Sequence, residues 1–114
     1  MDRIHAYQMV SRDEPFQKVD YSIPTLNPGE ALVQVSGCGV CHTDLSFWHD
    51  GVPTRHDLPL TLGHEISGIV LDGPDEIVGK PVIVPAVLPC GECDLCKNGR
   101  SNICRQQQMP GNDF

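Results

Sequence analysis

Four cysteines close together near the end of this 114-residue chain constrain its fold more than any other feature. Cys90, Cys93, Cys96 and Cys104 lie within fifteen consecutive positions, and such a density of thiols indicates either a tetrahedral metal site or extensive oxidation. Zinc accepts four thiolates at about 2.3 Å, and a complete set of four leaves no position for a substrate. The spacing therefore predicts a structural zinc site.

An iron–sulfur cluster and paired disulfides are the alternatives for these thiols. The bacterial ferredoxin run has three residues before its fourth cysteine and a proline after it, whereas here seven residues precede Cys104 and Arg105 follows it. A disulfide framework normally accompanies an export signal, but the N-terminus begins with charged residues and is followed by no apolar run of signal-peptide or membrane-spanning length. We expect a cytoplasmic protein.

The composition predicts a mainly β fold in a single domain. A length of 114 residues suits one domain, and 10 prolines and 11 glycines indicate short elements with many turns. Short apolar segments bounded by turn residues predict strands at 4–10, 16–23, 31–35, 66–71 and 81–88. Pro81 and Pro85 make the last of these an edge or bulged strand. A turn at 27–30 predicts a hairpin-like reversal between the second and third strands.

A short helix is expected within 41–48, capped by Thr43 or Asp44, and the chain from Cys90 onward is expected to be loop-like. Eight basic and fifteen acidic side chains give a net charge of -7, which argues against nucleic acid or an anionic membrane surface as a partner. No Gly-x-Gly-x-x-Gly loop joins a strand to a helix, so nothing in this chain is expected to hold a dinucleotide pyrophosphate.

Two further candidate ligands, Cys41 and His64, lie far apart in the sequence. Each alone is more often a packing residue, but their surroundings are informative. The runs 39–44 (GVCHTD) and 63–68 (GHEISG) resemble the catalytic-zinc motifs of zinc-dependent medium-chain alcohol dehydrogenases, and the run 89–100, with Cys104, closely resembles their structural-zinc lobe. The resemblance covers the whole chain. It implies a GroES-like partial barrel over residues 1–114, with short helices and a zinc-binding lobe at 89–105.

The same resemblance implies a role for five residues of the two short motifs. Cys41 and His64 would bind the catalytic zinc, and Glu65 would be an acidic neighbour able to approach the metal. Asp44 would accept a hydrogen bond from the other ring N–H of His64 and so fix its tautomer, although the role of a helix cap stays open. Thr43 would hydrogen-bond the alcohol and pass on its proton.

The resemblance also bears on other residues near the ligand motif. His42 matches a position that contacts the cofactor pyrophosphate in the family. Ser46 departs from the family pattern, which has a histidine in the proton relay there, so that His49 or a water would have to substitute. Phe47 and Trp48 either line the substrate pocket or belong to the core. Cys38 is interpreted as a buried bystander rather than a ligand.

The resemblance also implies a longer parent enzyme. A third catalytic-zinc ligand and a Rossmann domain are expected beyond Phe114, so that the chain alone is expected to be inactive. The parent, expected to be a homo-oligomer, would oxidise a secondary alcohol to a ketone with hydride transfer to NAD, and NADP stays open as the alternative cofactor. Its substrate would be a small-molecule alcohol or a hydroxyacyl-CoA, because the run 42–48 resembles dehydrogenases of anaerobic aromatic breakdown that act on such thioesters.

Two other functions compete with this interpretation. A non-enzymatic zinc-binding β module would use the four-cysteine lobe to stabilise a small domain that binds a partner, but such a module has no need of Cys41 and His64 beside an acidic group. A zinc-free quinone reductase, from another branch of the superfamily, would lack both ligand sets. The presence of both sets favours the dehydrogenase.

Overall fold

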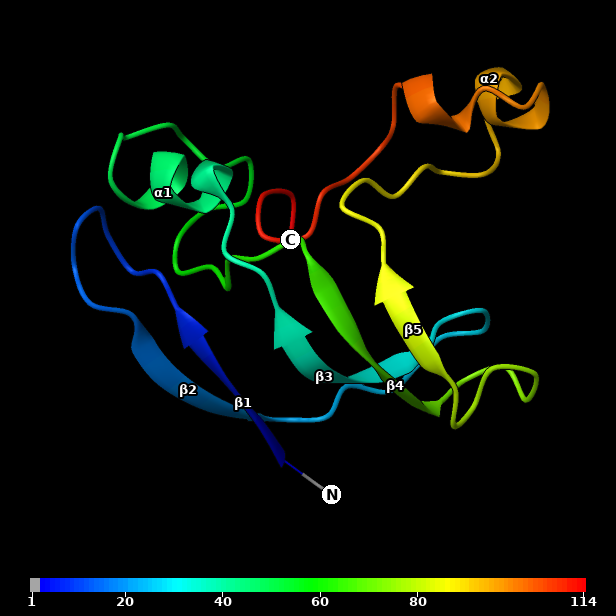
Figure 1. Ribbon diagram of the computed structural model, residues 1–114, viewed down its shortest axis with the longest axis horizontal. Helices are drawn as coiled ribbons and strands as arrows, with labels where there is room; N and C mark the ends of the chain where they lie inside the picture. Colours follow the sequence, from blue (N-terminus) through cyan, green and yellow to red (C-terminus); the bar gives the residue numbers. More distant parts are fainter. Residues whose placement is uncertain (1–2) are drawn as a thin grey trace.

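The computed structural model describes residues 3–114, which form two antiparallel sheets with short helices around them (Figure 1). In chain order the elements are β1 (Arg3–Gln8), β2 (Gln17–Ser22), β3 (Leu32–Cys38), α1 (His42–Trp48), β4 (Ile66–Asp72), β5 (Pro81–Val84), α2 (Asp94–Lys97) and the 3-10 helix η1 (Ser101–Ile103). The mainly β class with short helices that the sequence predicts is confirmed. No helix in this part of the chain is long and apolar enough to cross a membrane. The cytoplasmic location stays a prediction.

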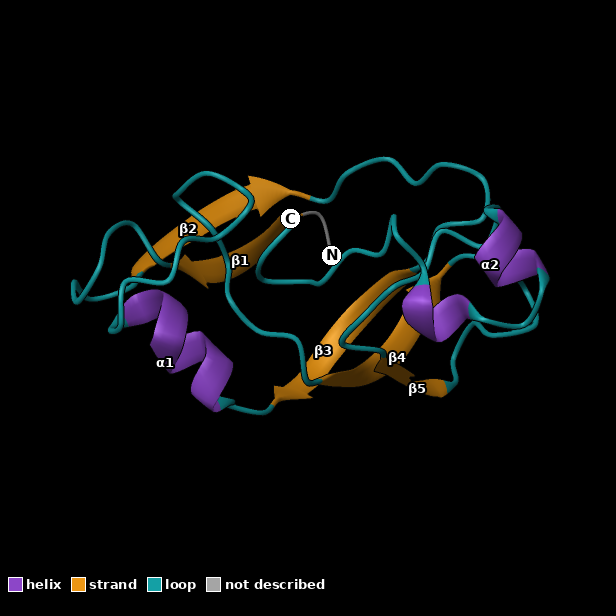
Figure 2. Ribbon diagram, turned by 90° about the horizontal axis from the view of Figure 1, so that it is seen from above, coloured by secondary structure: helices purple, strands orange, loops and turns teal. Residues whose placement is uncertain are grey.

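The strands are divided between a two-stranded ribbon, β1–β2, and a three-stranded sheet in the order β3–β4–β5 (Figure 2). A turn does form at 27–30, where the N–H of Glu30 donates to the carbonyl of Asn27 at 3.1 Å. The predicted hairpin between the second and third strands is nevertheless wrong, because β2 and β3 belong to different sheets. The residues between them connect the sheets instead of reversing within one.

β5 is an edge strand, as its prolines predict, since it pairs only with β4. It ends at Val84 rather than at 88, because Pro85 has no N–H with which to continue the ladder. The prediction of a loop from Cys90 onward is also wrong in part. Residues 94–97 form α2 and residues 101–103 form η1.

The first hairpin holds the C-terminal end of α1. At its tip, the N–H of Asp13 donates to the carbonyl of Trp48 at 3.0 Å, and the indole N–H of Trp48 donates to the carbonyl of Glu14 at 2.8 Å. Arg12 Nε donates to the carbonyl of His49 at 2.6 Å. The bonds from Asp13 and Arg12 occupy carbonyls that the helix end leaves free. Together with the bond from the Trp48 indole, they fix the helix that carries Thr43.

A small core lies between α1 and the segments that precede β4. Met9, Phe47 and Leu60 are its buried apolar residues, and Met9 and Leu60 are joined by a two-way backbone bridge at 2.9 and 3.0 Å. Val70 is buried separately, within β4. Phe47 is therefore a core residue, whereas Trp48 is half-buried at the rim of a cavity.

Gly68 is required by the close approach of β4 to β3. A Cβ at this position would lie 2.2 Å from the carbonyl oxygen of Gln34 and 2.7 Å from the side chain of Val33. We expect Gly68→Ala to lower the free energy of unfolding by about 3 kcal/mol, measured from the midpoint of urea denaturation. Gly37→Ala is the matched control, because its Cβ would meet nothing closer than Ser67 Oγ at 3.9 Å. Equal losses in the two variants would contradict this explanation.

Candidate metal centres

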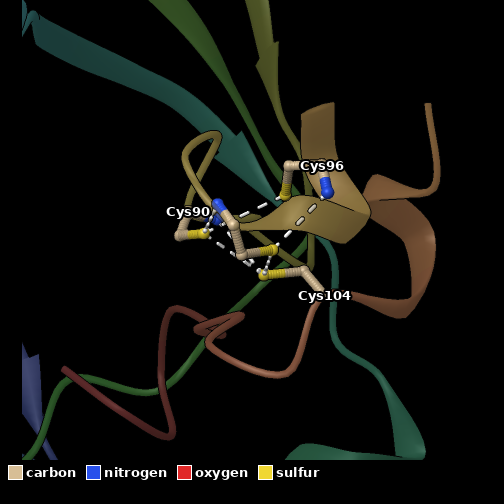
Figure 3. Close-up of side chains that lie close together, drawn as sticks. Cys90, Cys96 and Cys104 are labelled. Carbon is tan, nitrogen blue, oxygen red and sulfur yellow. Dashed lines mark hydrogen bonds between the residues drawn. The ribbon is translucent and has the colours of Figure 1, made fainter. Parts of the chain in front are cut away.

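The sulfur atoms of the four clustered cysteines converge in the lobe that follows β5. Figure 3 labels three of them, Cys90, Cys96 and Cys104. Sγ of Cys104 lies 3.6 Å from that of Cys90 and 3.8 Å from that of Cys93, and the sulfurs of Cys90 and Cys96 are 4.0 Å apart. A tetrahedral zinc with bonds of about 2.3 Å requires sulfur–sulfur separations of about 3.8 Å. The four thiols, which are free of disulfides, therefore fit a zinc ion.

Backbone N–H groups surround these sulfurs. Those of Glu92 and Cys93 donate to Cys90 Sγ at 3.4 and 3.3 Å, and those of Cys90 and Gln106 donate to Cys104 Sγ at 3.5 and 3.4 Å. The bonds from Glu92 and Cys93 lower the pKa of the Cys90 thiol to about 7, because they stabilise its charged form. The N–H of Cys96 lowers the pKa of Cys93, but burial and hydrogen bonds with the neighbouring thiols outweigh it and raise that pKa to about 11. The backbone donors thus favour a thiolate, the form that a metal binds, at Cys90.

The lobe has almost no core of its own. Among residues 89–105, Cys104 alone is buried, and the chain reaches left-handed φ angles of 76° at both Gly91 and Gly99. Leu88 and Gln108 close its base through two backbone hydrogen bonds of 2.7 and 2.9 Å, and the lobe projects beyond the sheets (Figure 1). With so little apolar burial, ligation of a metal by its four thiols would be the main source of folding free energy available to it.

A second cluster joins residues that are distant in the sequence. Cys41 Sγ, a ring nitrogen of His64 and a carboxylate oxygen of Glu65 all lie within 4.8 Å of one another. Cys41 is the N-cap residue of α1, while His64 and Glu65 immediately precede β4. The β3–β4 ladder brings the two segments together, since its last pair is Cys38–Ile66.

Asp44 contacts both halves of this cluster. Its Oδ2 accepts a hydrogen bond from the N–H of Cys41 at 3.0 Å, and its Oδ1 lies 3.5 Å from Nδ1 of His64. Cys41, rather than Thr43 or Asp44, is the N-cap of α1, and Asp44 acts from the first turn. The carboxylate of Asp44 thus stabilises the start of α1 and faces the imidazole of His64.

His64 is 7% exposed, and its Nδ1 and the Oδ1 of Asp44 are both buried without a hydrogen-bond partner. Leaving such a group unpaired costs about 1–3 kcal/mol. A metal on the opposite ring nitrogen, with Nδ1–H directed at Asp44, would satisfy the histidine and fix its tautomer. A cysteine, a histidine and a carboxylate are also a donor set that suits zinc. The residues of this second cluster therefore fit the metal.

The other predicted residues lie along α1. Oγ1 of Thr43 is 3.6 Å from Cys41 Sγ, which places its hydroxyl beside the cluster. His42 is exposed, and its carbonyl accepts a hydrogen bond from Ser46 Oγ at 3.2 Å. His49 is exposed and bonded to Asp13, whose carboxylate raises the pKa of the imidazole through a hydrogen bond and its charge. Ser46 and His49 are thus both engaged in local contacts.

Cys38 is exposed, and the prediction that it is buried is wrong. Cys38 is the last residue of β3. Its side chain lines an apolar cavity of about 200 Å³ together with Phe16, Leu45 and Trp48. Asp44 lies at the edge of the same cavity. Of the two aromatic residues considered for pocket lining, only Trp48 contributes to this wall.

Residues 27–112, which include both clusters, match the alcohol dehydrogenase GroES-like domain. The chain belongs to this family. An alcohol dehydrogenase from Geobacillus stearothermophilus is 39% identical over 103 residues, covering 86% of this chain and 31% of that protein. This result confirms the predicted family and the GroES-like fold.

Two solved structures show the same fold. A zinc-binding dehydrogenase from Sinorhizobium meliloti 1021, bound to NADP, superposes with a TM-score of 0.76 at 31% identity, covering 98% of this chain and 33% of its own. An NAD-dependent alcohol dehydrogenase gives a TM-score of 0.81 at 28% identity, with 96% of this chain and 34% of its own covered. The GroES-like chain described here therefore spans about a third of the length of these relatives.

The arrangement around His64 predicts the effect of changing Asp44. We expect Asp44→Ala to weaken zinc binding at the second cluster about 10- to 100-fold, as loss of a hydrogen-bond partner to a ligating histidine generally does, measured by competition with a chromophoric chelator. Asp44→Asn keeps an acceptor for the Cys41 N–H but removes the charge, and we expect it to weaken binding as well. If only the alanine variant loses affinity, Asp44 acts as a helix cap and not through His64.

Proposed function

We propose that this chain is the catalytic-domain part of a zinc-dependent alcohol dehydrogenase, which oxidises a secondary alcohol to a ketone and transfers the hydride to NAD. The observation that carries the proposal is the convergence of Cys41, His64 and Glu65 beside the hydroxyl of Thr43. The similar solved structures include an NAD-dependent enzyme and one bound to NADP. NAD is our first choice, and NADP is the alternative that an assay with both cofactors distinguishes.

Each residue of the cluster has a distinct part in the proposed reaction. Cys41 and His64 hold the metal, and Asp44 orients His64 from the side away from it. Zinc, when bound there, supplies Lewis acidity that lowers the pKa of an alcohol. The Thr43 hydroxyl would accept the alcohol proton and pass its own toward solvent. NAD, when bound, would supply the acceptor for the hydride. His42, exposed at the first turn of α1, is our candidate for contact with the cofactor pyrophosphate.

The remaining parts of the reaction would come from a longer protein. The relatives are about three times the length of this chain, and we propose that the missing part carries the nucleotide-binding domain and a further zinc ligand. Within residues 3–114, Glu65 offers a carboxylate oxygen within 4.8 Å of the ligand atoms of Cys41 and His64, so it could act as a third protein ligand. We expect the 114-residue chain alone to have no dehydrogenase activity.

The alcohol itself is proposed on resemblance alone. The run 42–48 and the N-terminal strands resemble those of 6-hydroxycyclohex-1-ene-1-carbonyl-CoA dehydrogenase, which would make the substrate a cyclic hydroxyacyl-CoA and place the enzyme in the breakdown of aromatic compounds. Rates on this thioester and on simple secondary alcohols, compared side by side, would decide between the two classes. A preference for the simple alcohols would remove the CoA proposal and leave the dehydrogenase.

Formation of NADH by the full-length protein, followed at 340 nm with secondary alcohols, tests the proposed function. We expect activity that is abolished in the variant combining Cys41→Ala with His64→Ala. Cys38→Ala is the control for loss of a nearby thiol, since that thiol lies outside the ligand cluster, and this variant should retain its zinc. A full-length protein inactive with both NAD and NADP, yet holding zinc in the lobe, would favour the non-enzymatic zinc-binding β module.

A further inference from the structure

Gly39 lies two residues before Cys41, and its backbone does not explain why it is a glycine. Eight glycines of the described chain have positive φ, but Gly39 is not among them. Its conformation is therefore one that any residue adopts. The reason for a glycine here must be the space that a side chain would occupy.

That space is filled by Glu65. A Cβ at position 39 would lie 3.2 Å from Cβ, 3.3 Å from Cδ and 3.4 Å from Oε1 of Glu65, so the glutamate side chain lies across the glycine. The N–H of Gly39 donates to the carbonyl of Glu65 at 2.9 Å, directly beyond the last pair of the β3–β4 ladder. This bond and the ladder hold the two main chains together. A side chain at 39 would therefore press on the Cβ of Glu65, which can give by only a small shift, and would turn the flexible carboxylate end away.

We infer that Gly39 is a positioning residue for Glu65, and that the missing side chain lets the carboxylate turn toward the ligand atoms of Cys41 and His64. This inference rests on the proposed metal site. Glu65 is exposed, and an exposed glutamate otherwise spreads over many rotamers. The surface of Gly39 provides the wall against which one of these rotamers packs, and that rotamer brings the carboxylate within 4.8 Å of both other ligands.

The loss of zinc affinity should increase with the size of the side chain introduced at position 39. The three separations at Gly39 are at or below the 3.5–4.0 Å of normal carbon contacts, so alanine requires a small shift of Glu65 and valine a larger one. Gly37, two residues earlier, provides a matched control because a Cβ there would meet only Ser67 Oγ, at 3.9 Å. Gly37→Ala should leave the metal cluster unchanged.

Zinc affinities of the purified chain, measured by chelator competition, test the inference. We expect Glu65→Gln to weaken the Cys41–His64 cluster about 10- to 100-fold, Gly39→Ala to weaken it less, and Gly39→Val to weaken it about 10-fold or more. Combining Gly39→Val with Glu65→Gln should be no worse than Glu65→Gln alone, because the glycine acts only through the glutamate. Zinc in the four-cysteine lobe serves as an internal control for folding.

Three other results would overturn either this inference or the proposed metal site. If Gly39→Val weakens zinc equally with and without Glu65→Gln, the glycine acts on the fold and the inference is overturned. If Glu65→Gln has no effect, there is no ligand for Gly39 to position, and the inference is overturned while the Cys41–His64 site stands. If removing Cys41 and His64 leaves zinc binding unchanged, the proposed metal site itself is absent. Should Gly39→Val unfold the chain, Gly39→Ala in both backgrounds gives the same comparison.

Discussion

Replacing both Cys93 and Cys96 with serine is expected to remove one tightly bound zinc per chain and to unfold residues 89–105. The reason is that the lobe buries only Cys104 and has few other contacts to hold it. Structural zinc supplies apparent binding free energies of about 10–16 kcal/mol in small metal-folded peptides. Elemental analysis measures the metal, and hydrogen exchange at the amides of α2 and η1 measures the unfolding.

The control for this variant is Cys38→Ser, which changes an exposed thiol outside both clusters and should retain the zinc. The β3–β4–β5 sheet should keep its protection in both variants, because the lobe is closed at its base by Leu88 and Gln108. A lobe that stays protected without metal, or that holds its cysteines in disulfides, would contradict a structural zinc.

Thr43→Val in the full-length enzyme is expected to lower kcat by about 10²- to 10⁴-fold, the usual contribution of a positioned proton-transfer group. Valine keeps the shape of threonine but has no hydroxyl. The side chain lies beside Cys41 Sγ without belonging to the ligand cluster, so zinc content should not change. Steady-state kinetics with a secondary alcohol measures the effect.

Thr43→Ser restores a hydroxyl at the same position and should recover most of the rate. Recovery by serine distinguishes proton transfer from packing, because serine lacks the methyl group that valine retains. A valine variant with unchanged kcat would show that Thr43 takes no part in the reaction, even if the zinc site is as proposed.

The lobe could be predicted from the sequence because its ligands are local. Cys90 and Cys104 are separated by few residues, and zinc's preference for four thiolates makes such spacing specific. Its short helices are not predicted by the sequence pattern, since α2 has only four residues and its N-cap is Cys93, whose sulfur accepts the N–H of Cys96. Because α2 is organised around a metal ligand and not around an apolar face, its sequence has no apolar periodicity from which a helix could be predicted.

The second cluster could not be predicted from spacing alone. Cys41 and His64 meet only because β3 pairs with β4 in one register, and register depends on the packing of both sheet faces. The pairing of Cys41 with His64 was predicted from the resemblance of the two short motifs to a family, and not from apolar periodicity. Contacts of the main chain also leave no signal in the side-chain pattern, which is why the N–H donors of Glu92 and Gln106 were missed.

The zinc content of the purified chain, with and without the combined substitutions Cys41→Ala and His64→Ala, shows whether this domain holds two metal centres. Two zinc ions per chain are expected: one held tightly by four thiolates, and one held more weakly by Cys41, His64 and Glu65, which have fewer charged ligands. The weaker ion alone should be lost in the double variant. Iron in place of zinc, oxidised thiols without metal, or a zinc content that the double variant leaves unchanged would contradict a dehydrogenase catalytic domain with two metal centres.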